Sequence, residues 1–239
     1  MRLGLLILIL VGLSGPALSQ SLSVDLGGEG SLSMRSIQLL VLITLLSLVP
    51  GLAVMVTCFP FIVTVLSILR QAIGLQQSPP NMLIVSLALF LTWFVMDPVF
   101  TEAWTNGIEP LSKGHIDIQA AIPATLAPFR AFMAARLDPE VFNSLQELRP
   151  GPATPIPDAP LSLLVPSFLL SEVQRAFEIG FMIFLPFLII DLVVAAVLMS
   201  MGMMMVPPAI VSLPFKLAFF VVANGWALIA GALVRSYGV

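Results

Sequence analysis

The sequence has few charged residues, one cysteine and one histidine. Of its 239 residues, 10% are charged and 59% are hydrophobic, and the mean hydropathy is +1.07. Soluble domains carry about 25% charged residues, so this composition excludes a water-soluble globular domain. Disordered chains combine low hydrophobicity with high net charge, whereas the net charge here is only −3. The sequence therefore predicts an integral membrane protein or a subunit of a membrane complex.

The scarcity of reactive side chains excludes several kinds of site. With Cys58 as the only cysteine, the chain can form neither an internal disulfide nor a thiolate metal cluster. His115 is the only histidine and has no partner at ligand spacing, which argues against zinc. Neither a G-x-S-x-G nor an S-x-x-K motif occurs, and the lysines and arginines form no basic patch. We therefore expect no enzymatic activity, no cofactor, no metal and no nucleic-acid partner.

The N-terminal residues 1–19 have the pattern of a signal peptide. A positive charge precedes an apolar run, and Ala17 and Ser19 are small residues at the positions that signal peptidase reads. The alternative is a short uncleaved helix, but the run of eleven apolar residues would rise only about 16 Å, against a bilayer core of about 30 Å. We predict cleavage between Ser19 and Gln20, followed by a flexible leader over residues 20–33.

Two apolar regions predict hydrophobic helical hairpins in an all-α membrane fold. The first covers residues 34–100, with a kink or break at its prolines and a polar turn, RQAIGLQQSPPN, between its helices. Its second helix is expected to be interrupted at Asp97-Pro98. The second hairpin covers residues 179–239 and is punctuated by glycine and proline around residues 202–208.

Residues 101–178, between the hairpins, are the only stretch with the composition of a soluble domain. Amphipathic patterns predict short helices over residues 118–137 and 139–148, the second with Asp138 as its N-cap. Five prolines within residues 149–160 predict an extended connector. If the mature N terminus lies outside the cytoplasm, an even number of crossings places this domain outside as well. We therefore predict an extracytoplasmic, mainly helical domain.

Three ionisable residues, Asp97, Asp191 and Lys216, stand inside apolar segments, where an unpaired charge costs several kcal/mol. Asp97 is either functional or an interfacial residue at a helix end. Asp191 is predicted to be buried or pore-facing and to support assembly or the pore. Lys216 can pair with it within the hairpin if the turn lies at residues 202–205, but not if it lies at Pro207-Pro208. Pairing between subunits is the alternative.

Five methionines fall within the seven positions 199–205, beside Gly202. Methionine is unbranched and adaptable, so such a cluster can close an aperture and then repack around varied side chains. The alternative is ordinary apolar packing. Concentration at a break marked by glycine favours a flexible constriction.

Two long runs of the sequence are specific far beyond what apolar composition gives. They are FPFIVTVLSILRQAIGLQQSPPN over residues 59–81 and, within residues 171–217, the strings IIDLV, GMMMVPP and LPFK. Both runs, together with Gly225-Trp226, resemble the FliP family of flagellar biosynthetic proteins. The resemblance covers nearly all of residues 59–233. The turn and motif residues that it carries are Arg70, Gln71, Pro79, Pro80, Asn81, Pro207 and Pro208.

The resemblance implies a subunit of the flagellar type III export gate, in the bacterial inner membrane at the flagellar basal body. It implies a pentamer that assembles with small hairpin Q subunits and one R subunit into a helical, conical pore complex, which contacts larger export and basal-body proteins. Unfolded flagellar subunits would pass through it, with Met203, Met204 and Met205 as a gasket. In this family much apolar surface packs between subunits or against lipid, so individual hairpins need not cross a bilayer.

Three other functions are compatible with parts of the sequence. The corresponding subunit of a virulence injectisome has the same fold but usually lacks a cleavable signal peptide, so residues 2–20 favour the flagellar branch. A small-solute transporter would also bury charges, but it should show more membrane segments and an internal repeat. A purely structural assembly factor would need no constriction.

Overall fold

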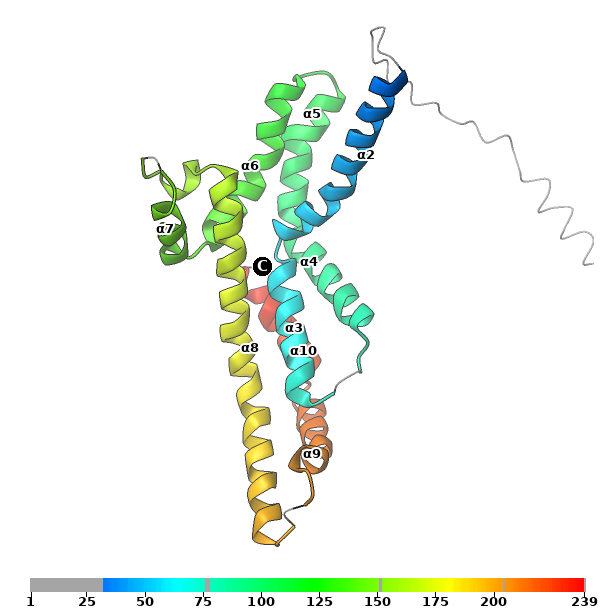
Figure 1. Cartoon of the computed structure of the whole chain (residues 1–239), viewed down its shortest axis with the longest axis vertical. Coiled ribbons are helices and arrows are strands. Elements are labelled where there is room, and N and C mark those ends of the chain that lie inside the picture. Colours follow the sequence, from blue (N-terminus) through cyan, green and yellow to red (C-terminus); the bar gives the residue numbers. More distant parts are fainter. Residues whose placement is uncertain (1–31, 76–77, 151, 204, 239) are drawn as a thin grey trace, which may run out of the picture. The chain divides into compact units, whose positions relative to one another are not determined.

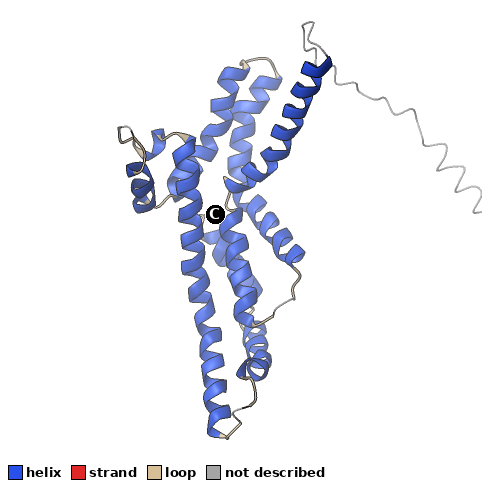
Figure 2. Cartoon of the chain, in the orientation of Figure 1, coloured by secondary structure: helices blue, strands red, loops and turns tan. Residues whose placement is uncertain are grey.

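The computed structural model describes residues 32–75, 78–150, 152–203 and 205–238. Every regular element in these ranges is helical, with no strand among them (Figure 2), which confirms the all-α prediction. The chain divides into two units, residues 1–45 and 46–239. The predicted signal peptide, with its cleavage site at Ser19 and Gln20, lies outside the described residues, as does most of the leader.

The first hydrophobic region forms three helices: α2 Leu32–Met55, α3 Phe59–Ile73 and α4 Asn81–Ala103 (Figure 1). The expected break falls at residues 56–58, directly before Pro60, which lies in the first turn of α3. A helix start suits proline because no intrahelical amide bond is lost there. α2, by contrast, continues through Pro50.

The predicted interruption at Asp97-Pro98 is wrong. α4 runs through both residues and continues into a π-helix, η1 Trp104–Ile108, and a short helix, α5 Glu109–Ser112. Pro98 removes one helical hydrogen bond, but α4 packs against α3 and α6, and this packing holds the helix together.

The polar region folds as the amphipathic patterns predict. α6 spans Ile118–Arg136 and α7 spans Pro139–Glu147, each within one residue of the expected limits. The carboxylate of Asp138 accepts a hydrogen bond from the Glu140 amide at 2.8 Å, which confirms the predicted cap. Residues 152–160 of the connector are extended except for one short 3₁₀-helix, η2 Ile156–Asp158.

The last three helices are α8 Leu161–Ser200, α9 Pro208–Val222 and α10 Gly225–Arg235. The axes of α9 and α10 differ in direction by 61°, and Asn224, between them, has a φ of 51°. α8 is a single helix of 40 residues that passes residue 178, just as α4 passes residue 100. Both proposed limits of the polar domain therefore lie inside helices.

α3 is the centre of the main core. It packs along α8 and also against α4 and α9 (Figure 1). Gly180 allows α8 to approach closely, because a Cβ atom there would lie 2.4 Å from Cδ1 of Ile68 on α3. The buried face of α3 recurs at helical spacing: Phe61, Ile62, Val65, Leu66, Leu69, Ala72 and Ile73.

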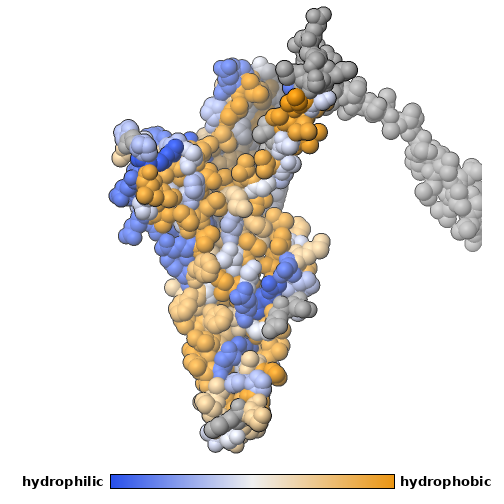
Figure 3. Space-filling model, viewed as in Figure 1, coloured by the Kyte–Doolittle hydropathy of each residue, from blue (hydrophilic) through white to orange (hydrophobic). Residues whose placement is uncertain are grey.

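Among the residues that the structure describes, three helical stretches are long and apolar enough to cross a membrane: Ser36–Met55, Asn81–Ser112 and Leu161–Ser200. The bent pair α9 and α10 adds a fourth if the two helices count as one span. Hydrophobic residues cover much of the visible surface formed by α8 and α9 (Figure 3). Such exposed apolar surface indicates contact with lipid or with other subunits.

Candidate functional site

Asp191 and Lys216 form an ion pair inside the second hairpin. The Lys216 ammonium lies 2.6 Å from Oδ2 of Asp191 and also donates a hydrogen bond to the carbonyl of Ala72 at 3.2 Å. The hydroxyl of Ser212 donates to Oδ1 of Asp191 at 2.5 Å. Three helices, α8, α9 and α3, thus meet at this pair. Of the arrangements left open by the sequence, the structure shows the one within the chain.

The end of α8 places the two charges at the same depth. Gly202 has a φ of 77°, and the amides of Gly202 and Met203 donate to the carbonyls of Met199 and Leu198, each at 3.0 Å. These bonds form a Schellman motif, which requires a left-handed residue and therefore favours glycine. Asp191 lies nine residues before the end of α8, and Lys216 lies eight residues after the start of α9.

Burial makes the pair energetically important. The Lys216 side chain is 7% exposed and that of Asp191 is 31% exposed. A buried ammonium needs a counter-charge and hydrogen-bond acceptors to offset the loss of water. Asp191 supplies the counter-charge, and the Ala72 carbonyl supplies a second acceptor. Removing Asp191 would leave the ammonium with the carbonyl alone.

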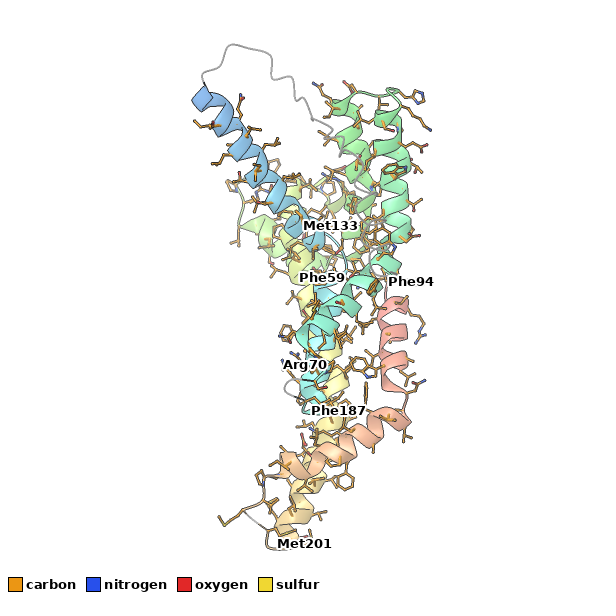
Figure 4. The ribbon with its side chains drawn as sticks, turned by 90° about the vertical axis from the view of Figure 1, so that its right-hand side faces the viewer. Phe59, Arg70, Phe94, Met133, Phe187 and Met201 are labelled. Atoms are coloured by element: carbon orange, nitrogen blue, oxygen red, sulfur yellow. The ribbon has the colours of Figure 1, made fainter. Side chains whose placement is uncertain are left out.

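The methionine run lies at the tip of the same hairpin. Figure 4 shows Met201 at the tip of this hairpin, directly after α8. The side chains of Met201 and Met203 are exposed, and Met205 is 97% exposed. Met204 lies outside the described residues. The gasket role of Met203, Met204 and Met205 stays a prediction.

The turn motif organises the connection between α3 and α4. Gly74, with a φ of 89°, ends α3, and its amide donates to the Gln71 carbonyl at 3.0 Å. Arg70, at the end of α3 (Figure 4), donates to Oδ1 of Asn81 and to the Pro79 carbonyl at 3.5 Å. Arg70 therefore ties the end of α3 to the start of α4.

The remaining motif residues fall at helix ends or on the surface. Pro80 is the residue before α4, Pro207 is the residue before α9, and Pro208 is the first residue of α9. Asp97 is exposed within α4, away from either helix end, and its side chain makes no hydrogen bond or ion pair within the described ranges. The structure does not bring Asp97 into contact with the Asp191–Lys216 pair.

Sequence reasoning missed a second buried charge. Glu172 on α8 has no exposed side-chain surface, and it pairs with Arg136 of α6 and Arg175 of α8. Glu172 lies in the polar stretch, where a charged residue is expected to be exposed to solvent. The available signal was its spacing of four residues from Phe168 and from Ala176, apolar residues on the same face of α8.

The FliP family model matches residues 42–233 of this chain. The chain belongs to the FliP family. The flagellar biosynthetic protein FliP of Caulobacter vibrioides is 49% identical over 225 residues, which cover 92% of this chain and 84% of that protein. The proteins of the same name from Agrobacterium fabrum and Bacillus subtilis are 44% identical over 237 residues and 43% identical over 205 residues. These cover 97% and 84% of this chain, and 97% and 92% of those proteins, respectively.

The FliP match includes both buried charge sites on α8. Residues 42–233 contain Asp191, Lys216, Glu172 and Arg136, together with the methionine run. Tyr237, whose hydroxyl donates a hydrogen bond to Glu172, lies beyond the match. The resemblance that the sequence runs indicated is therefore confirmed at the level of the family.

Proposed function

We propose that this chain is a pore-forming core subunit of the flagellar type III protein export gate, located in the bacterial inner membrane at the basal body. Its membership of the FliP family carries the proposal, because its relatives over most of the chain are named flagellar biosynthetic proteins. This name favours the flagellar gate over a virulence injectisome. The proposed cargo is unfolded flagellar subunits, and the proposed role is transport without catalysis.

The exposed apolar surface supports assembly into a multi-subunit complex. On α8, large hydrophobic side chains such as Phe181 and Leu192 are more than half exposed, on a helix that continues into the polar part of the chain. A single soluble subunit rarely leaves so much apolar surface in water. We propose that copies of this chain, five in number, together with Q and R subunits and lipid, cover this surface.

The methionine tip supports a closed constriction at the centre of such a ring. Met203 and Met205 lie in a short connection whose shape is fixed by Gly202. Their side chains are exposed and do not belong to the buried core. A ring of thioether side chains offers a passing ion nothing in place of its water, so the ion meets a barrier of several kcal/mol or more. The same side chains are flexible enough to yield to an exported chain.

The Asp191–Lys216 pair stabilises the helices that carry the proposed constriction. It ties α8 to α9 and, through the Ala72 carbonyl, to α3, so that the hairpin presents its tip in one position. In this proposal the pair serves assembly and pore geometry through its partners in the chain. Neither residue takes part in chemistry.

Native mass measurement of the detergent-extracted complex tests the proposal directly. We expect a complex that contains five copies of this chain together with smaller Q and R subunits. The measurement uses a strain whose motility depends on this chain. A mass that corresponds to a monomer or dimer of the chain would contradict the gate proposal and favour a lone transporter. Loss of motility on deletion, restored by the chain itself, is the matched control.

A further inference from the structure

The C-terminal end of the chain is held by the second buried charge. Tyr237 follows α10, and its hydroxyl donates a hydrogen bond to Oε2 of Glu172. The other carboxylate oxygen, Oε1, accepts from Nε of Arg136 at 3.1 Å and from Nη1 of Arg175 at 3.4 Å. Each oxygen of a fully buried carboxylate is therefore satisfied, and one of them depends on the C-terminal segment.

Arg136, the last residue of α6, contacts the same segment in two further ways. Its Nη1 donates to the Ser236 carbonyl at 2.7 Å. Its guanidinium carbon lies 3.9 Å from the centroid of the Tyr237 ring, a cation–π distance. One arginine thus binds both the buried carboxylate and the segment that the carboxylate holds.

Two aromatic rings complete the site. Phe61 of α3 meets the Tyr237 ring edge to face at 5.6 Å between centroids. Phe132 of α6 stacks on the same ring at 6.0 Å. The tyrosine is therefore contacted by side chains from α3, α6 and α8, three helices that are far apart in the sequence.

The Tyr237 hydroxyl stays protonated in this site. Burial raises the pKa of Tyr237 above its ordinary value, and the neighbouring Glu172 carboxylate raises the pKa further by charge repulsion and by accepting a hydrogen bond from the hydroxyl. A phenolate beside a buried carboxylate would be repelled. The tyrosine therefore acts as a permanent donor at neutral pH.

α10 contributes Leu233, which is 2% exposed, to the main core and borders a cavity on the side of α8. A cavity of about 350 Å³ separates α10 from α8, with Ile183 on one side and Ile229 on the other. At its other end α10 begins at Asn224, where the left-handed backbone and the 61° bend form a joint. α10 is thus held by the joint at Asn224, by Leu233 in the core and by Tyr237 beyond its last residue.

We propose that Phe61, Phe132, Arg136 and Glu172 form a binding site for a phenol together with the backbone carbonyl that precedes it, occupied by the chain's own Ser236–Tyr237 segment. Release of this segment frees α10 to swing about Asn224. Because α10 borders the cavity against α8, the swing widens the apolar cavity between the two helices. The site thus couples the position of α10 to the junction of α6 and α8.

Hydrogen–deuterium exchange of the purified full chain tests this proposal. Tyr237→Phe keeps the ring and removes only the donor, so we expect the amides of residues 225–235 to exchange about tenfold faster, while those of α8 keep their rates. Ser144→Ala, which removes an exposed hydroxyl of α7 that bonds only to the Val141 carbonyl, is the control, with α10 rates within twofold of the unsubstituted chain. Unchanged exchange in α10, or an equal rise in every helix, would overturn the proposal.

A second variant keeps the test decisive if Tyr237→Phe does not fold. Arg136→Lys retains a cation beside Glu172 but loses the planar guanidinium that reaches the Ser236 carbonyl. The proposal expects the same local rise in α10, and its absence would contradict the site. Both measurements use the isolated chain, so their outcome is independent of whether the chain works in an export gate.

Discussion

The two buried charge sites on α8 differ in depth and in composition. The Asp191–Lys216 pair holds one cation and one anion, and the Asp191 side chain remains 31% exposed. The Glu172 site holds one carboxylate against two arginines and a tyrosine, and no part of the Glu172 side chain is exposed. The first ties the hydrophobic hairpin together, whereas the second joins the polar helices to the C terminus. Because the Glu172 carboxylate is more deeply buried, we expect the Glu172 site to contribute more to stability than the Asp191–Lys216 pair.

Removing the Glu172 carboxylate should have the largest effect. In Glu172→Ala, Arg136 loses its counter-charge in a buried site, and such losses cost about 3 to 5 kcal/mol. The free energy of unfolding in detergent, from denaturant titration, measures the loss. Glu178→Ala is the matched control, because Glu178 is exposed on the same helix and its replacement should change stability by less than about 0.5 kcal/mol.

Asp191→Ala should cost less stability than Glu172→Ala, about 2 to 3 kcal/mol, because its partial exposure lets water reach the abandoned ammonium. The double change Asp191→Ala with Lys216→Met removes both charges and should recover part of the stability and of the complex yield. Asp97→Ala, in an exposed position, serves as the control. A larger loss of stability at Asp191 than at Glu172, or no recovery in the double variant, would contradict the expected difference between the two sites.

Gly180 lies between the two sites on α8 and tests whether they act independently. In Gly180→Ala the new Cβ would lie 2.4 Å from Cδ1 of Ile68, so overpacking should cost about 1 to 3 kcal/mol. Gly51→Ala, with no atom within 4 Å of the added Cβ, should be neutral or stabilising. If the sites are independent, combining Gly180→Ala with either charge variant gives additive losses.

Cys58 offers the smallest perturbation and a pH-dependent readout. Burial raises the pKa of the Cys58 thiol to about 12, with a further rise from Glu172, so the thiol stays neutral at pH 8. Since the thiolate is the reactive form, maleimide labelling of the folded chain should be slow at pH 8 and accelerate toward pH 12. Labelling at the rate of an unfolded thiol at pH 8 would contradict the burial. Glu172→Ala should speed labelling more than Asp191→Ala does.

The sequence predicted those parts of the fold that depend on local pattern. The cap at Asp138 and the limits of α6 and α7 follow from side chains within one turn of each helix end. Asp191 and Lys216 were found because isolated charges in apolar runs must be explained. The persistence of α4 through Pro98 could not be read from the chain, because packing against α3 and α6 outweighs the local penalty.

The Glu172 site could not be predicted for a different reason. Its partners, Arg136 and Tyr237, lie 36 and 65 residues away, and only the folded arrangement of α6, α8 and α10 brings them together. In a polar stretch each of these residues resembles a surface residue. Burial at a junction of helices is a tertiary property, whereas burial inside an apolar run is visible in the sequence.

We propose that the methionine tip closes a pore formed by several copies of this chain, and ion flux through the purified assembly measures whether it does. Alanine at Met203, Met204 and Met205 should widen the ring while leaving the helices intact, because these positions come after the last residue of α8 and before the first residue of α9. Met182→Ala, an exposed methionine on α8 far from the tip, is the control. We predict ion leakage in the triple variant and a tight assembly in the control. Tightness equal to that of the unsubstituted assembly in the triple variant would contradict the account.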